Sequence, residues 1–138
     1  MLQPKKQKYR KVFRRRSALT GKAKGDTRIA FGEFALKAIT PAELTARQIE
    51  SARKAINNSL NREGKLWIRS FPHKTVTAKA AEVPMGSGKG SPDHYVLPVC
   101  PGRIIFELGG ISEERAREAF RVGMHKLPFQ CKFLIKEF

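Results

Sequence analysis

Residues 44–64 read LTARQIESARKAINNSLNREG, and this stretch decides the fold. Thr45 followed by Gln48 has the spacing of a capping box, which marks the start of a helix. Apolar residues then recur at steps of three and four until Gly64 ends the pattern. These residues are Ile49, Ala52, Ile56 and Leu60. The pattern predicts an amphipathic helix that buries one face and leaves a basic face, with Arg47, Arg53, Lys54 and Arg62, in solvent.

A second helix is predicted to begin at Ser112 and to stop before Pro128. Glu113 and Glu114 occupy its first turn, where the helix dipole favours negative charge. Its apolar stripe consists of Ala116, Ala119, Phe120, Met124 and Leu127. This helix therefore also buries a single face.

The rest of the folded part is predicted as strands. The strand-like runs are residues 28–31, 34–39, 65–71, 95–100, 103–108 and 130–138. Pro98 should place its strand at an edge or a bulge, because proline cannot donate to a ladder. The Pro101-Gly102 pair predicts a hairpin between the two runs that flank it. Half-apolar strands and one-sided helices together predict an α+β fold, with both helices on one face of a mixed, largely antiparallel sheet.

The N-terminal segment carries positive charge without any negative charge. Ten Lys and Arg residues and no Asp or Glu fall within the first 25 residues of this 138-residue chain. They are Lys5, Lys6, Lys8, Arg10, Lys11, Arg14, Arg15, Arg16, Lys22 and Lys24. Such a field repels itself unless a polyanion neutralises it, and nucleic acid is the first candidate. An organelle import signal is a second interpretation. We expect a basic arm over residues 1–27 and one domain over residues 28–138.

Composition excludes several classes of protein. No apolar run approaches the roughly 20 residues that span a bilayer, and no secretion signal is visible, so we expect no membrane partner. Cys100 and Cys131 have no C-x-x-C partner and are predicted as small buried hydrophobes in a reducing compartment. The net charge of +16 extends the basic character beyond the arm.

Residues 72–93 show no secondary-structure pattern and contain a glycine-rich loop. The loop consists of Met85, Gly86, Ser87, Gly88, Lys89 and Gly90. A P-loop is excluded because Lys89 is followed by glycine instead of Ser or Thr, and the dinucleotide fingerprint fails at Ser91. Two interpretations remain open: a flexible loop without a partner, and backbone N–H groups with Lys89 that meet RNA phosphates.

No catalytic or metal-binding constellation is visible. His73, His94 and His125 lie in different elements, and none has a second ligand at metal spacing. The acidic residues are interpreted as mostly sitting on helices beside basic ones, as Glu113 does with Arg117, which is typical of solvated helix faces. We therefore predict no enzyme, no cofactor, no metal and no small-molecule substrate. Trp67 is interpreted as a core residue, with base stacking as the alternative.

Several motifs in order resemble one family, the large-subunit ribosomal protein L-sixteen family of bacteria and organelles. They are Met1-Leu2-Gln3-Pro4-Lys5-Lys6, Arg10-Lys11, residues 44–53, Trp67-Ile68-Arg69, Phe71-Pro72, residues 85–90 and Lys126-Leu127-Pro128. The resemblance implies an α+β body, an arm inserted in large-subunit ribosomal RNA near the peptidyl-transferase region, and a glycine loop that reaches toward transfer RNA. Family members commonly carry Arg before Met-Gly, whereas this chain has Pro84.

The prediction is a structural RNA-binding protein of the large ribosomal subunit. The arm cations, together with Arg47, Arg53 and Lys54, are expected to bind ribosomal RNA, and residues 85–90 are expected to face transfer RNA. Neighbouring ribosomal proteins are the other expected partners, on a cytoplasmic bacterial ribosome or an organelle ribosome. A free-standing RNA-binding or RNA-chaperone module is the alternative.

Overall fold

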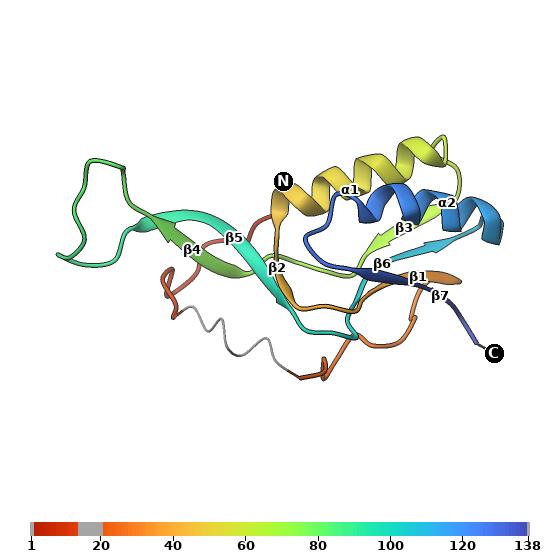
Figure 1. The fold of residues 1–138 in the computed structure, drawn as a ribbon, viewed down its shortest axis with the longest axis horizontal. Coiled ribbons are helices and arrows are strands. Elements are labelled where there is room, and N and C mark those ends of the chain that lie inside the picture. The colour runs from red at the N-terminus through yellow and green to blue at the C-terminus, as the bar shows by residue number, and fades with distance from the viewer. Residues whose placement is uncertain (1, 14–20, 138) are drawn as a thin grey trace.

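Two helices lie on one face of a four-stranded antiparallel sheet, and a second sheet extends away from this body (Figure 1). The computed structural model describes residues 2–13 and 21–137. The larger sheet has the order β3 (Lys65–Ile68), β6 (Ile104–Gly109), β1 (Phe34–Ala38) and β7 (Cys131–Ile135). The smaller has the order β2 (Ala42–Thr45), β5 (Ser91–Val99) and β4 (Lys74–Ala78). The α+β prediction is confirmed, but the single sheet is wrong.

Both helices form where their sequence patterns place them. Helix α1 (Ala46–Ser59) begins at the expected capping box, in which the Gln48 backbone N–H donates to Thr45 Oγ1 at 3.2 Å and the Thr45 N–H donates to Gln48 Oε1 at 2.9 Å. Helix α2 (Glu113–Met124) has Ser112 as its N-cap. Capping of this kind satisfies N–H groups that have no partner inside the helix.

The core lies between the helices and the larger sheet. Helix α1 contributes Ile49, Ala52 and Ile56, and α2 contributes Ala116, Ala119 and Phe120, all buried. Phe34, Leu36, Phe106 and Leu108 face them from β1 and β6. The helices approach closely, since a Cβ atom on Gly123 would lie 2.6 Å from Ile56 Cγ1. Trp67 is outside this cluster and only half-buried, so its interpretation as a core residue is wrong.

Residues 28–31 do not form the predicted strand. Instead, the backbone N–H groups of Ala30, Phe31 and Gly32 donate to Glu107 Oε1 at 3.0, 2.8 and 2.9 Å. A carboxylate from β6 thus takes the donors that a neighbouring strand would have used. The apolar pattern of Ile29 and Phe31 could not reveal this competitor.

The turn at Pro101-Gly102 exists, but the predicted hairpin around it is wrong. Strands β5 and β6 belong to different sheets, because the turn binds the end of β1: the Gly102 N–H donates to the Ala38 carbonyl at 2.7 Å. The prediction that Pro98 places its strand at an edge is also wrong, because β5 is the central strand of its sheet. Pro98 pairs with Glu43 of β2, whereas the pairing of β5 with β4 ends at Val96, so only one strand lies beside the proline.

The segment 72–93 is not structureless. It contains β4 and the start of β5, which pair as a long hairpin with a register shift between Val76 and Thr77. This β4–β5 hairpin projects from the body (Figure 1). Thr75, Val76 and Thr77 supply the β-branched residues that favour a strand, a signal that the interpretation from glycine content overlooked.

Candidate nucleic-acid interface

The basic arm lies beside the β4–β5 hairpin. Leu2 packs partly against the core near the start of α1, and the chain then follows the hairpin toward its loop. Gln7 Nε2 donates to the His73 carbonyl at 3.4 Å, and Lys11 Nζ donates to the Lys89 carbonyl at 3.1 Å. In return, Lys89 Nζ donates to the Val12 carbonyl. Two predicted RNA-binding segments, about 78 residues apart in sequence, are thus brought together.

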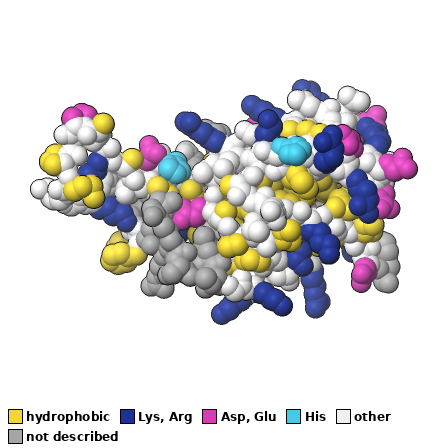
Figure 2. Space-filling model, in the orientation of Figure 1, with side chains coloured by type: hydrophobic (Ala, Val, Ile, Leu, Met, Phe, Trp, Pro, Cys, Tyr) yellow, Lys and Arg dark blue, Asp and Glu magenta, His cyan; other side chains and the backbone are white. Residues whose placement is uncertain are grey.

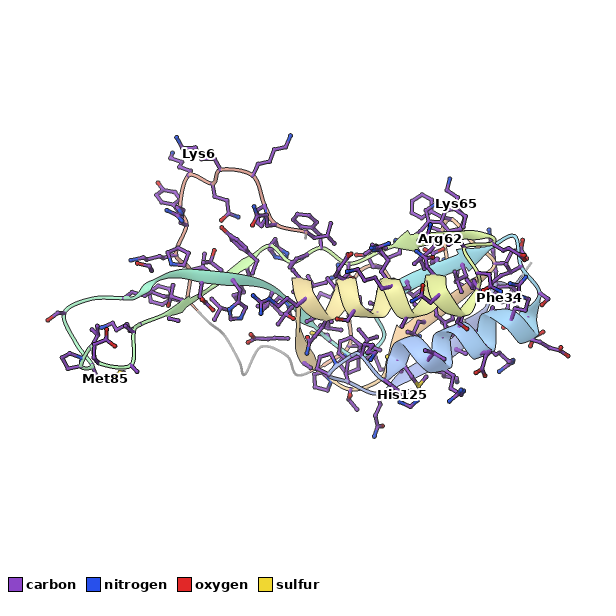
Figure 3. All side chains as sticks on the ribbon, turned by 90° about the horizontal axis from the view of Figure 1, so that it is seen from above. Lys6, Phe34, Arg62, Lys65, Met85 and His125 are labelled. Atoms are coloured by element: carbon purple, nitrogen blue, oxygen red, sulfur yellow. The ribbon has the colours of Figure 1, made fainter. Side chains whose placement is uncertain are left out.

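The tip of the hairpin is an exposed glycine loop. Gly86 and Gly88 have φ of 107° and 104°, a region that favours glycine, and Lys79 Nζ closes the loop by donating to the Gly86 carbonyl at 2.7 Å. Met85 is 95% exposed and lies at the far end of the hairpin (Figure 3). Figure 2 shows hydrophobic side chains at this tip and Lys and Arg side chains projecting from the body. The tip therefore presents backbone and apolar atoms, with Lys89 behind them beside the arm.

The three cations of helix α1 that are predicted to bind RNA lie on two different parts of the surface. Arg47 lines a hollow with Leu2 and Gln3, near the start of the arm. Arg53 and Lys54 border another hollow of about 520 Å³, which Asn57, Asn58 and Arg62 complete. The two asparagines were missed as candidate site residues, although they lie three and four positions after Lys54 and so share its helix face.

Arg53 is not a free cation. Its Nε donates to Glu50 Oε2 at 3.0 Å, and hydrogen bonding to Glu50 raises the pKa of the Arg53 guanidinium. Lys54 and Arg62 are exposed on the same hollow. The hollow is therefore a positively charged surface with amide donors beside it, which suits a phosphate group.

The remaining arm cations are elsewhere. Lys22 lies in a hollow beside Lys37 and the Pro101-Gly102 turn, and the nearby Ala23 N–H donates to the Pro101 carbonyl at 2.9 Å. Lys24 is exposed on the same segment. Arg14, Arg15 and Arg16 lie outside the described residues. The structure thus brings Lys5, Lys6 and Arg10 to Tyr95 of the hairpin, Lys11 to Lys89, and Lys22 to the body, whereas Lys8 and Lys24 are exposed.

A buried carboxylate holds the end of the arm on the body. Glu107 is fully buried, accepts the three N–H groups of residues 30–32, and forms an ion pair with Arg69. Arg69 Nη2 continues to Asp26 Oδ1 at 2.8 Å, and Asp26 Oδ2 also meets Arg103 Nη2 at 3.1 Å. Asp26, the first acidic residue of the chain, is therefore part of a structural network.

The described residues contain no arrangement typical of an active site. No group of three or more His, Cys, Asp or Glu among them could hold a metal ion, and no described helix is long and apolar enough to cross a membrane. Cys100 and Cys131 are half-buried, which is less than predicted. Burial raises the pKa of the Cys131 thiol to about 12, so it is not a nucleophile at neutral pH.

A small α+β body with a cationic arm, a glycine-tipped hairpin and a basic helix face defines a structural protein of the nucleic-acid-binding class. The family model for "Ribosomal protein L16p/L10e" matches residues 4–134, and the chain belongs to this family. The large ribosomal subunit protein uL16 of Heliobacterium modesticaldum is 54% identical over 137 residues, which cover 99% of this chain and 94% of that protein.

Family membership confirms the resemblance that the motifs indicated. The chain is a structural constituent of the large ribosomal subunit and serves translation without being an enzyme. Of the two expected locations, a cytoplasmic bacterial ribosome and an organelle ribosome, the bacterial relative indicates the first.

Proposed function

We propose that this chain binds large-subunit ribosomal RNA near the peptidyl-transferase region with its arm and α1, and contacts transfer RNA with the hairpin tip. The observation that carries the proposal is the reciprocal contact of Lys11 with the Lys89 carbonyl and of Lys89 with the Val12 carbonyl. It joins the arm to the loop, so an arm fixed in RNA also sets the position of the tip. The division into an arm of residues 1–27 and a domain of residues 28–138 is part of this proposal.

Charge supports the role of the arm. Lys5, Lys6 and Lys8 are exposed and have no acidic neighbour within the arm, so their charge is available to phosphates. Each neutralised phosphate releases counterions and contributes to a salt-dependent affinity. On α1, Lys54 and Arg62 add a second positively charged surface.

The composition of the tip supports a different role. Residues 85–88 have small or flexible side chains and no charge, and Gly86 and Gly88 let the backbone approach a partner closely. A surface of this kind suits contact with a partner that arrives and leaves, because it adds little electrostatic attraction. Lys89 is then one cation between the fixed arm and the moving partner.

Crosslinking in purified large subunits tests both roles at once. A photoreactive amino acid replaces Lys6, Met85 or, as a control on the acidic side of α2, Glu118. We expect position 6 to crosslink ribosomal RNA with or without transfer RNA, and position 85 to crosslink transfer RNA only when it is bound. Position 118 should yield neither product.

Two results would contradict the proposal. Absence of a transfer-RNA product at position 85 would remove the role of the tip. Release of nearly all the protein from subunits at moderate salt, with no assembly defect on depletion, would favour the free-standing RNA-binding module instead.

A further inference from the structure

Exposed Phe31 and half-buried Trp67 form an aromatic pair away from the hairpin tip. Their ring centroids are 6.2 Å apart and their planes differ by 19°. Phe31 is 60% exposed, yet its backbone is fixed, because the N–H groups of residues 30–32 donate to buried Glu107. Lys65, next to this pair, lies on the body and far from Met85 at the hairpin tip (Figure 3). An exposed ring is thus held in place by a buried carboxylate.

Cations surround the two rings. Lys65 Nζ lies 5.3 Å from the centre of the Trp67 ring, and the Arg69 guanidinium lies 5.2 Å from that of Phe31. Such contacts leave the positive charge beside the aromatic faces, where a stacked nucleotide would place its phosphates. Lys136 lines the same surface.

A hollow of about 440 Å³ opens beside the rings, and glycines form its floor. A Cβ atom on Gly32 would lie 2.5 Å from the Leu108 carbonyl oxygen and 3.0 Å from Trp67 Cζ3, and one on Gly109 would lie 3.1 Å from the same Trp67 atom. Only glycine therefore lets the indole ring rest directly on the backbone. Glu33 also lines the hollow, so its interior suits an uncharged ring better than a phosphate.

We propose that Phe31 and Trp67 form a stacking platform for an unpaired RNA base, with Lys65 receiving a flanking phosphate. The inference rests on the proposed binding of ribosomal RNA and adds a site that neither the arm nor the hairpin includes. A nucleotide supplies both the flat ring and the negative charge that this surface matches. An apolar protein segment would match the rings but would offer no negative charge to Lys65.

Trp67 reports on the platform directly, because it is the one tryptophan of the chain. The full-length chain is titrated with a short single-stranded oligoadenylate and with an abasic oligonucleotide of the same length and charge. Tryptophan fluorescence follows stacking, and the anisotropy of a dye on the RNA follows binding. We expect both oligonucleotides to bind and only the oligoadenylate to quench Trp67.

Phe31→Leu tests the second ring, and Phe71→Leu is its matched control, since Phe71 is also an exposed phenylalanine, at 43%, but lies outside the platform. Loss of a stacking ring should raise the oligoadenylate concentration for half-quenching roughly 5-fold or more. The control should leave that concentration unchanged. Circular dichroism of both variants checks that the fold is kept.

The outcomes separate the platform from the proposed function. Binding without quenching, or equal quenching by the abasic oligonucleotide, overturns the platform and leaves arm-mediated binding intact. Absence of any RNA binding overturns both. In purified large subunits, ultraviolet crosslinking should join a peptide containing Phe31 or Trp67 to a nucleotide, and a crosslink to a neighbouring protein instead would also overturn the platform.

Discussion

Glu107 carries a buried charge that fixes residues 30–32, just after the arm, on the body. Its carboxylate accepts three backbone N–H groups and pairs with Arg69, all within a fully buried site. Glu107→Gln keeps the shape but removes the charge, so it should lower the free energy of unfolding by about 2 to 3 kcal/mol. Urea denaturation at pH 7 measures this. Glu118→Gln, which changes only a solvent-exposed pair with Arg121, should leave the midpoint unchanged.

The same carboxylate predicts a pH dependence. Burial alone would raise the pKa of Glu107, but the N–H groups of Gly32 and Phe31, and then Arg69, outweigh burial and hold this pKa below the ordinary 4.5. As pH falls, the unfolded chain therefore takes up the proton first. The stabilisation is complete above about pH 4.5 and is lost as pH falls through the lower folded-state pKa.

Wild type and Glu107→Gln should accordingly differ most at pH 7 and converge below about pH 4.5. Denaturant titrations of both proteins at pH 7, 5 and 3 provide the comparison. A difference that stays constant down to pH 3 would show that the charge of Glu107 does not contribute.

Residues differ in how far their roles can be predicted from sequence. The capping box of Thr45 and Gln48 could be predicted from the sequence, because the two residues that form it are three positions apart. The role of Glu107 could not be predicted, since its three backbone partners lie 75 to 77 positions away and Arg69 lies 38 positions away. Its position in an apolar strand, six consecutive buried residues, was the only available hint.

At the scale of elements, the contact of α1 with α2 depends on one glycine. Gly123→Ala gains helix propensity, about 1 kcal/mol, but places a Cβ atom 2.6 Å from Ile56 Cγ1 and 2.9 Å from Ile56 Cδ1. Because Ile56 is buried and branched, the steric overlap should outweigh the gain in helix propensity. The free energy of unfolding should therefore fall by about 1 to 2 kcal/mol. Thermal unfolding measures the loss.

The Ile56→Ala background controls for this explanation. In the Ile56→Ala background, the added methyl group of Gly123→Ala enters the space that the isoleucine side chain occupied. Gly123→Ala should then lower the free energy of unfolding less, or even raise it. Equal costs in both backgrounds would mean that the two residues are not coupled and that the overlap is relieved elsewhere.

Helices were easier to predict than strands. Each helix carries its cap, periodicity and stop signal within one stretch, as residues 44–64 do. Strand β2, only four residues with Glu43 among them, has no period to detect, and β4 lies between Pro72 and a glycine loop. The assignment of β5 and β6 to different sheets depends on the bond from Gly102 to Ala38, which no local pattern encodes.

For the whole molecule, the sequence predicted RNA-binding roles for the arm and the loop but not how the two are arranged. The run of Lys and Arg without Asp or Glu identified the arm, and the glycine content identified the loop of residues 85–90. Their contact through Lys11 and Lys89 joins distant segments and required the structure. The aromatic pair was also hidden, because Phe31 was interpreted as part of a strand and Trp67 as part of the core.

The arrangement predicts which cations determine the salt dependence of RNA binding. Lys5, Lys6 and Lys8 are exposed arm cations, whereas Arg117 and Arg121 on α2 are already paired with Glu113 and Glu118. Replacing the three lysines by glutamine should reduce the slope of log affinity against log salt concentration by roughly 2 to 3 in magnitude. Each phosphate contact contributes about 0.7 to 0.9 to this slope.

Filter binding to purified large-subunit RNA between low and moderate salt measures the slope. The Arg117→Gln and Arg121→Gln double variant should change it little, since those guanidinium groups release few counterions when RNA binds. A slope that falls equally in both variants would mean that RNA responds to total charge alone. The position of the arm beside the hairpin would then have no part in recognition.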